Sequence, residues 1–273
     1  MQRHFALLAV LLPVSMFSGA LPTLQDHAPA SEQVRVNPPG LRHAEPPPAN
    51  ASVEELESRA EQLRSEKDYA DAIDYYRAAI NKDRGNASLY NKVGIAELMI
   101  QHYGDARKSF ERAIKLDHDS ADAHNNLGVV RYEEKKYSKA IEEYQKAIQL
   151  RQDSASFYSN LGAAYYMKKQ WEPATEAYSH ALQLDPDIFG RTSRTGVTAQ
   201  LPSPEDRARF DYVIAKLYAK QGDPDRSLQY LRRCLEEGYK GINGVYKDPE
   251  FSSLRNDPRF AQLMASKPAP IPE

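Results

Sequence analysis

Small and large apolar residues recur along the chain every 34 residues, in register over four units that begin at Val53, Ala87, Ala121 and Ala155. The eighth position of a unit is Ala or Gly, the twentieth is Ala, and the twenty-fourth is always aromatic: Tyr76, Phe110, Tyr144 and Tyr178. Between these positions apolar residues fall three and four apart, and turn residues divide each unit in two. The pattern predicts a pair of antiparallel helices per unit, which approach closely at the small residues.

The four units, 53–86, 87–120, 121–154 and 155–188, are followed by a degenerate fifth unit, 208–241. The insert 189–207 between them has two interpretations that the sequence leaves open: a functional lid or partner-binding loop, or a tolerated surface insertion. Ser203 and Pro204 predict a helix start after it. In residues 242–273 the pattern Asp-Pro-x-Phe-x-x-Leu occurs twice, from Asp248 and from Asp257. It predicts two short helices that cap the last unit; the alternative is a peptide-like docking motif.

The N-terminus has the pattern of an export signal. Residues 1–20 contain Arg3, an apolar run from Phe5 to Leu12 and the small residues Ser18-Gly19-Ala20, which predict a signal peptide cleaved after Ala20. A membrane anchor is disfavoured because the run is shorter than a bilayer-spanning helix. Residues 21–52 are Pro-rich without an apolar period and predict a flexible linker. We therefore expect a periplasmic or secreted protein with no stable membrane insertion.

The 34-residue register resembles the tetratricopeptide repeat (TPR) family over about residues 53–239. The resemblance implies an all-α fold, a right-handed solenoid of antiparallel helix pairs, and a function in binding proteins or peptides. Position 11 departs from the family pattern: it is Leu63, Glu97 and Arg131 in the first three units, and the usual Tyr only at Tyr165.

In the family the first helix of each unit lines the concave groove, which makes nine residues candidate partner contacts. They form an amide ladder beside an apolar and aromatic strip: Asn91, Lys92, Asn125, Asn126, Asn160, Tyr132, Tyr166, Met99 and Met167. Asn is a poor helix former, and its amide can pair with the backbone of an extended peptide. A similar ladder lines the solenoid of the O-linked N-acetylglucosamine transferase family. The alternative is that these amides bond neighbouring helices to each other. The Lys/Asn clamp for a C-terminal carboxylate is not matched by any three consecutive units.

The sequence contains no motif of a known catalytic site: no phosphate loop, nucleophile elbow, C-x-x-C or H-E-x-x-H. Cys234 occupies a position that holds Ala in other units, which indicates packing. Asp117, His118, Asp119, Asp122 and His124 lie close in sequence, but spacing alone does not specify metal ligands. The net charge is -2, without the basic excess that nucleic-acid binding favours. We predict no enzyme, cofactor, metal or nucleic-acid partner.

Two functions remain. The first is a non-enzymatic scaffold or adaptor that holds a protein or extended peptide in its groove, as a chaperone-like or assembly factor of the cell envelope. The alternative is a structural subunit of a larger envelope or secretion complex, with contacts on the convex face, the insert or the ends.

Overall fold

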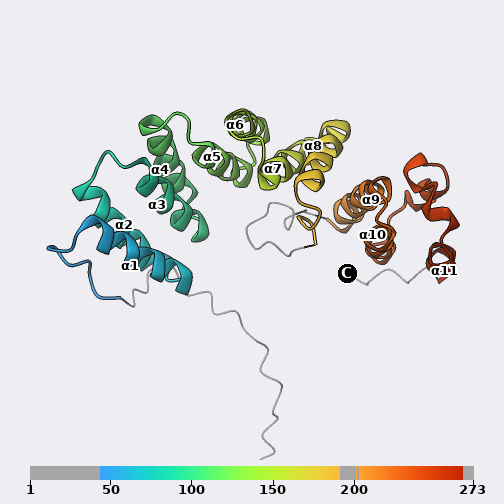
Figure 1. Ribbon diagram of the computed structural model, residues 1–273, viewed down its shortest axis with the longest axis horizontal. Helices are drawn as coiled ribbons and strands as arrows, with labels where there is room; N and C mark the ends of the chain where they lie inside the picture. The colour runs from blue at the N-terminus through green and yellow to red at the C-terminus, as the bar shows by residue number, and fades with distance from the viewer. Residues whose placement is uncertain (1–43, 191–200, 202, 267–273) are drawn as a thin grey trace, which may run out of the picture. The chain divides into compact units, whose positions relative to one another are not determined.

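Each repeat unit folds as two consecutive helices, and each pair packs on the next (Figure 1). The computed structural model describes residues 44–190, 201 and 203–266, all within one compact unit, Pro39–Glu273. Every regular element in these residues is helical. The first four pairs are α1 (Val53–Glu66) with α2 (Tyr69–Lys82), α3 (Ala87–Met99) with α4 (Tyr103–Leu116), α5 (Ala121–Glu133) with α6 (Tyr137–Leu150), and α7 (Ala155–Met167) with α8 (Trp171–Leu184). The fifth pair is α9 (Pro204–Gln221) with α10 (Pro224–Glu236).

In the second, third and fourth units, glycine on the first helix and an aromatic ring on the second set the distance between the two helices of a pair. A Cβ added to Gly94 would lie 2.7 Å from Phe110, and one on Gly128 would lie 2.6 Å from Tyr144. Both rings are fully buried. Because a methyl group at 2.6 Å overlaps the ring, the helices can pack this closely only where the first helix has no side chain.

Local signals begin and end the helices. Ser52 and Glu55 form the predicted capping box: the Ser52 hydroxyl accepts from the Glu55 amide at 3.1 Å, and the Glu55 carboxylate accepts from the Ser52 amide at 2.7 Å. Ser203 caps α9 with Pro204 in its first turn, as predicted. The turns inside the first four units each contain one residue with positive φ: Lys67, Gln101, Lys135 and Lys169. The fifth unit has Gly222 there, the residue for which this conformation is least costly.

The end of the Pro-rich segment lies against the second helix. The Tyr75 hydroxyl donates to the carbonyl of Glu45 at 3.0 Å, and the Lys82 ammonium donates to the carbonyl of Ala49 at 2.9 Å. Ala44 and Ala51 pack on the first hydrophobic cluster. The last residues of the predicted linker therefore cover α2.

Aromatic side chains join the fourth unit to the fifth across the insert. The ring centroids of Phe189 and Phe210 lie 5.8 Å apart, and each ring meets that of Tyr178 edge to face with centroids 5.4 Å apart. The Tyr230 hydroxyl donates to the carbonyl of Phe189 at 2.7 Å, and the Tyr218 hydroxyl donates to that of Pro186 at 2.9 Å. Residues 191–200 and 202, where the predicted lid would lie, are outside the described residues.

The repeated Asp-Pro segments close the last unit. The first forms two 3₁₀ turns, η3 (Pro249–Phe251) and η4 (Leu254–Asn256), after another, η2 (Ile242–Tyr246). The second forms α11 (Pro258–Ser266). Phe and Leu of both segments are buried. The sequence predicted two similar short helices; the first is 3₁₀ instead, with Asp248 accepting from the Tyr212 hydroxyl at 2.9 Å and pairing with Lys216 at 3.0 Å.

The first helix of the fifth unit contains a buried carboxylate. Asp211 in α9 is 2 % exposed, and its ion-pair partner Arg233 lies 3.0 Å away. Burial raises the pKa of Asp211 to about 7; Glu237 adds to the rise, while Arg233 and Arg207 oppose it. The buried thiol of Cys234, on α10, also has a raised pKa because burial disfavours the thiolate.

No helix among the residues described is both long and apolar enough to span a bilayer. The predicted signal peptide, with its cleavage after Ala20, lies outside the described residues and stays a prediction.

The substitution Gly128→Ala should lower the free energy of unfolding by about 2 kcal/mol, because the new methyl group overlaps Tyr144. Gly104→Ala is the matched control: Gly104 lies in α4 with nothing within 4 Å of the added Cβ. That change should stabilise the protein by roughly 0.5–1 kcal/mol through helix propensity alone. Urea unfolding followed by circular dichroism measures the free energy of unfolding of both variants. Equal changes in Gly128→Ala and Gly104→Ala would contradict the proposed overlap with Tyr144.

The substitution Asp211→Asn should flatten the dependence of stability on pH. The folded pKa of Asp211, about 7, lies above its unfolded value. The folded state therefore binds the proton more tightly, and stability falls as pH rises from about 4 through 7. Between pH 5 and 8 the parent should lose about 2–3 kcal/mol relative to the variant. Chemical denaturation at several pH values tests this, and parallel curves would show that Asp211 is already ionised at pH 5.

Candidate functional site

The predicted amides come together along the first helices of the second, third and fourth units. The Asn126 amide donates to the carbonyl oxygen of Asn91 at 3.1 Å, and the Asn160 amide donates to that of Asn125 at 3.0 Å. Asn125 in turn donates to Asn126 at 3.4 Å. Four side chains from three helices thus form one connected amide ladder.

Lys92 extends the ladder to the first unit with an ion pair. Its ammonium lies 2.7 Å from Glu57 and 3.0 Å from Glu61, both on α1. The Glu57–Lys92 pair has the same separation of 35 residues as the two amide pairs. Burial disfavours ionisation of Glu61, but hydrogen bonds from Arg64 and Lys92 prevail and lower its pKa to about 2. Lys92 is therefore held by carboxylates of this chain.

The nine predicted residues differ in how much solvent they reach. Asn125, Asn160, Tyr132 and Tyr166 are buried, at 9 %, 6 %, 4 % and 2 % exposure, whereas Met99 is 38 % exposed. The other four, Asn91, Lys92, Asn126 and Met167, are half-buried. A partner that meets the protein as the structure shows it can therefore contact five of the nine residues directly.

The start of α9 covers Tyr166. The Tyr166 hydroxyl donates to the backbone carbonyl of Asp206 at 2.7 Å. The rings of Trp171 and Phe210 meet Tyr166 edge to face at 5.0 and 6.3 Å. Tyr166 thus joins the fourth unit to the fifth, a role that the helical pattern of its own unit does not reveal.

Half-buried apolar side chains continue beside the open end of the ladder. Ile95 and Leu98 of α3 and Val129 of α5 pack on the core with part of their surface in solvent. By their positions in the repeat, these residues, Met99 and Met167 fall on one face of the first helices, and we refer to them as a partly open apolar strip. We call this strip and the pair Asn91 and Asn126 the inner face.

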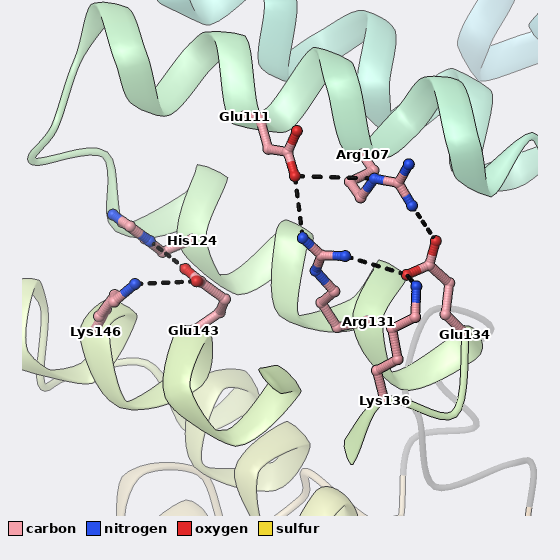
Figure 2. Close-up of polar contacts among 8 residues, drawn as sticks. All are labelled: Arg107, Glu111, His124, Arg131, Glu134, Lys136, Glu143 and Lys146. Atoms are coloured by element: carbon pink, nitrogen blue, oxygen red, sulfur yellow. Dashed lines mark hydrogen bonds and ion pairs between the residues drawn. The ribbon is translucent and has the colours of Figure 1, made fainter. Parts of the chain in front are cut away.

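A charged ring joins α4 to α5, as Figure 2 shows. Glu134 lies 2.6 Å from Arg107, 3.4 Å from Arg131 and 2.9 Å from Lys136. Glu111 completes the ring, at 3.0 Å from Arg131 and 3.9 Å from Arg107. Burial disfavours ionisation of Glu134, yet its three cations lower its pKa. Alternating charges within one ring fix how the second unit meets the third.

The contact between Glu111 and Arg131 in this ring is one case of a pairing that recurs along the stack. In each case a residue of the second helix of one unit contacts the residue 20 positions later, on the first helix of the next unit. Arg77 pairs with Glu97 at 2.7 Å, Glu111 with Arg131 at 3.0 Å, and the Gln145 amide donates to the Tyr165 hydroxyl at 3.0 Å. The second member of each pair is at position 11. Where position 11 departs from the family pattern, the residue 20 positions before it is of a kind that pairs with it. The sequence analysis did not use this spacing of 20, which would have predicted these pairs.

The predicted Asp and His cluster is divided among separate partners. His124 lies 2.7 Å from Glu143, which also pairs with Lys146 at 3.0 Å (Figure 2). Asp122 pairs with Arg151 at 2.5 Å. Burial disfavours ionisation of Glu143, but hydrogen bonds from His124 and Lys146 lower its pKa. Across the part of the chain that the structure describes, no three His, Cys, Asp or Glu residues are grouped as metal ligands.

Family models match the chain in the same region. A model described as TPR repeat matches residues 101–135 and 130–169. Two models described as tetratricopeptide repeat match residues 155–188 and 209–237. No curated protein sequence matches the chain.

Solved structures share the fold. MamA from Desulfovibrio magneticus RS-1 has 17% sequence identity and a TM-score of 0.50, over 68% of this chain and 94% of that one. PilF of Pseudomonas aeruginosa has 20% identity and a TM-score of 0.50, over 75% and 81%. Another MamA structure has 25% identity over 65% and 93%, with a TM-score of 0.48. At 17% and 20% identity, the likeness to the first two structures shows the fold alone.

Asn160→Ala should destabilise the protein by about 2 kcal/mol, because it leaves the buried Asn125 carbonyl oxygen without a donor. Asn91→Ala should cost less than about 1 kcal/mol, since water can reach half-buried Asn126. The double variant Asn125→Ala/Asn160→Ala should show a coupling of about 1 kcal/mol in a double-mutant cycle. Urea unfolding of these variants, of Asn125→Ala and of the parent completes the cycle; additive effects of Asn125→Ala and Asn160→Ala would mean that the pair contributes nothing.

Proposed function

The chain is a tetratricopeptide-repeat protein, and we propose that it is a non-enzymatic scaffold that holds an extended segment of another protein on its inner face. A stack of helix pairs presents the same helix face in every unit, so a segment that lies across several units meets a repeated set of side chains. Several weak contacts along one extended chain then add to a useful affinity.

The observation that carries the proposal is the partly open strip beside the amide pair. Met99, at 38 % exposure, and half-buried Ile95, Leu98, Val129 and Met167 offer apolar surface, and Met adapts to varied side chains. Asn91 precedes Ile95 by four positions and Leu98 by seven, and Asn126 precedes Val129 by three, so helical spacing puts both amides on the same helix faces as this strip. An amide donates two hydrogens and its oxygen has two lone pairs, so the Asn91–Asn126 bond leaves capacity for the backbone of a bound peptide.

The buried members of the predicted groove support the partner indirectly. Asn125 and Asn160 hold α5 against α7, and Tyr132 and Tyr166 fill the core beneath the strip. We infer that these four residues position the surface and that Asn91, Asn126, Met99 and Met167 contact the partner. Lys92 contacts a partner only if it leaves Glu57 and Glu61.

The finer role that we propose is that of an exported adaptor, chaperone-like or assembly factor of the cell envelope. It rests on the signal-peptide pattern of residues 1–20. The alternative is a structural subunit that meets its partners through the second helices, the insert or the ends. The exposed row on α6, with Lys139 and Glu142, offers a surface for that alternative.

Binding of selected peptides tests the proposal. Peptides enriched on the mature chain from a random displayed library are measured by fluorescence anisotropy against the parent and Asn91→Ala/Asn126→Ala. The amide variant should weaken binding at least about tenfold, or ~1.4 kcal/mol.

The matched control is Lys139→Ala/Glu142→Ala on α6, which should leave affinity unchanged. Unchanged affinity in the amide variant, with loss in the α6 variant, would favour the alternative surface and contradict the inner face.

A further inference from the structure

The first helix of the fifth unit already holds a short segment of the chain itself. Tyr212 and Lys216 of α9 stand at positions 5 and 9 of this unit, where the second unit has Asn91 and Ile95 of the inner face. Residues 248–251, with the sequence Asp-Pro-Glu-Phe, lie against Tyr212 and Lys216. The positions that we assign to a partner in the second unit are therefore occupied from within in the fifth.

The two side chains of α9 contact different groups of this segment. The Tyr212 hydroxyl donates to Oδ2 of Asp248 at 2.9 Å, and the centroid of the Tyr212 ring lies 5.6 Å from that of Phe251. The Lys216 ammonium lies 3.0 Å from Asp248 and 3.3 Å from Glu250. The surface thus contacts two carboxylates and one aromatic ring within four consecutive residues.

The second Asp-Pro segment provides a comparison within the same molecule. It shares Asp, Pro, Phe and Leu with the first but has Arg259 where the first has Glu250. Arg259 pairs with Asp225 of α10 at 2.5 Å, whereas Glu250 meets Lys216 of α9. Because opposite charges attract, the charge of this third residue agrees with the helix that each segment contacts. The α9 surface therefore favours an acidic residue there.

The chain's own segment does not satisfy this surface completely. Oε2 of Glu250 is buried and has no hydrogen-bond partner among the residues that the structure describes. A buried acceptor without a donor is costly, so a segment that avoids this cost would bind better. The side chains of Asp248 and Lys216 are 30 % and 26 % exposed, so solvent and a competing segment can reach their ion pair.

We propose that Tyr212 and Lys216 form a second peptide-recognition surface, selective for Asp-Pro followed by an acidic and an aromatic residue. Residues 248–251 occupy it until a partner protein presents the same chemistry. The occupant is tethered to α10 through residues 237–241, which gives it an effective concentration on the order of millimolar. A partner displaces it by binding more tightly or by binding a further site as well. The inference goes beyond the proposed function, because it concerns the fifth unit and charged rather than amide contacts.

A labelled peptide with the sequence of residues 244–256 tests the inference by fluorescence anisotropy with the full mature chain. The parent should bind it weakly, because its own segment competes. Gly244→Ala should bind it at least about tenfold more tightly, since a Cβ added to Gly244 would overlap the Tyr212 hydroxyl and push the chain's own segment away. Gly104→Ala, whose added Cβ has nothing within 4 Å, is the matched control and should bind like the parent.

Two further changes, made with Gly244→Ala, test the chemistry of recognition. Lys216→Gln should weaken binding of the peptide at least about tenfold. Lys139→Gln, which removes the charge of an exposed lysine on α6, should leave it unchanged. A neutral peptide of the same length, with Asp248→Asn and Glu250→Gln, should bind at least about tenfold more weakly than the acidic one.

Hydrogen exchange across residues 242–251 measures release of the chain's own segment in Gly244→Ala and in a second variant of the chain, Asp248→Asn/Glu250→Gln. The inference is overturned if neither variant releases the segment, if a variant that releases it does not bind the peptide, or if the acidic and neutral peptides bind equally. Asn91→Ala/Asn126→Ala should not change the affinity for this peptide. Failure at α9 therefore leaves the inner-face scaffold intact, and failure of the scaffold leaves the α9 surface intact.

Discussion

In the second, third and fourth units, the contact between a glycine on the first helix and an aromatic ring on the second sets the geometry on which the pairings between these units depend. Gly128 allows the Tyr144 ring to approach the α5 backbone, and Gly94 and Gly162 do the same for Phe110 and Tyr178. Because these contacts recur at one position of the second, third and fourth units, the hairpins of these three units have nearly the same spacing. Equal spacing then lets one kind of side-chain pair recur from unit to unit.

Two such pairings follow from this regular stack. Residues 35 apart join successive first helices, as in Asn91 with Asn126, and residues 20 apart join a second helix to the next first helix, as in Glu111 with Arg131. The first pairing lies at the inner face, and the second lies between units. Two ion pairs and one neutral hydrogen bond at the second pairing connect successive units, while the inner face keeps amides and apolar side chains for a partner.

The sequence predicted the features that depend on local periodicity. The 34-residue register gave the helix pairs, and the Ser52 and Glu55 pattern gave the capping box that the structure contains. The sequence also placed the amides in a row, but it left open which atoms meet. That depends on rotamers and on the distance between first helices. In the structure Asn126 donates one N–H to Asn91 and accepts from Asn125, and its second N–H remains for the proposed partner.

Other features depend on contacts that no local pattern reveals. Tyr166 occupies a groove position in its own helix, yet α9 covers it because the fifth unit returns to the stack after the insert. Arg131 departs from the family pattern, and its reason is Glu111 on the preceding helix. The first Asp-Pro segment forms 3₁₀ turns because Asp248 is held by Tyr212 and Lys216 of α9. In each case a residue distant in the chain determines the outcome.

The pairing at a spacing of 20 also makes the order of the units matter. Arg77 of the first unit faces Glu97 of the second, and Glu111 of the second faces Arg131 of the third. A chain that lost the second unit would bring Arg77 opposite Arg131, so two like charges would meet where an ion pair stood. Loss of the third unit would bring Glu111 opposite Tyr165, a neutral mismatch. The units share one apolar pattern, but the charged residues at these pairing positions differ from unit to unit. These charges therefore determine which units can be neighbours, and they restrict which units the array can lose or exchange.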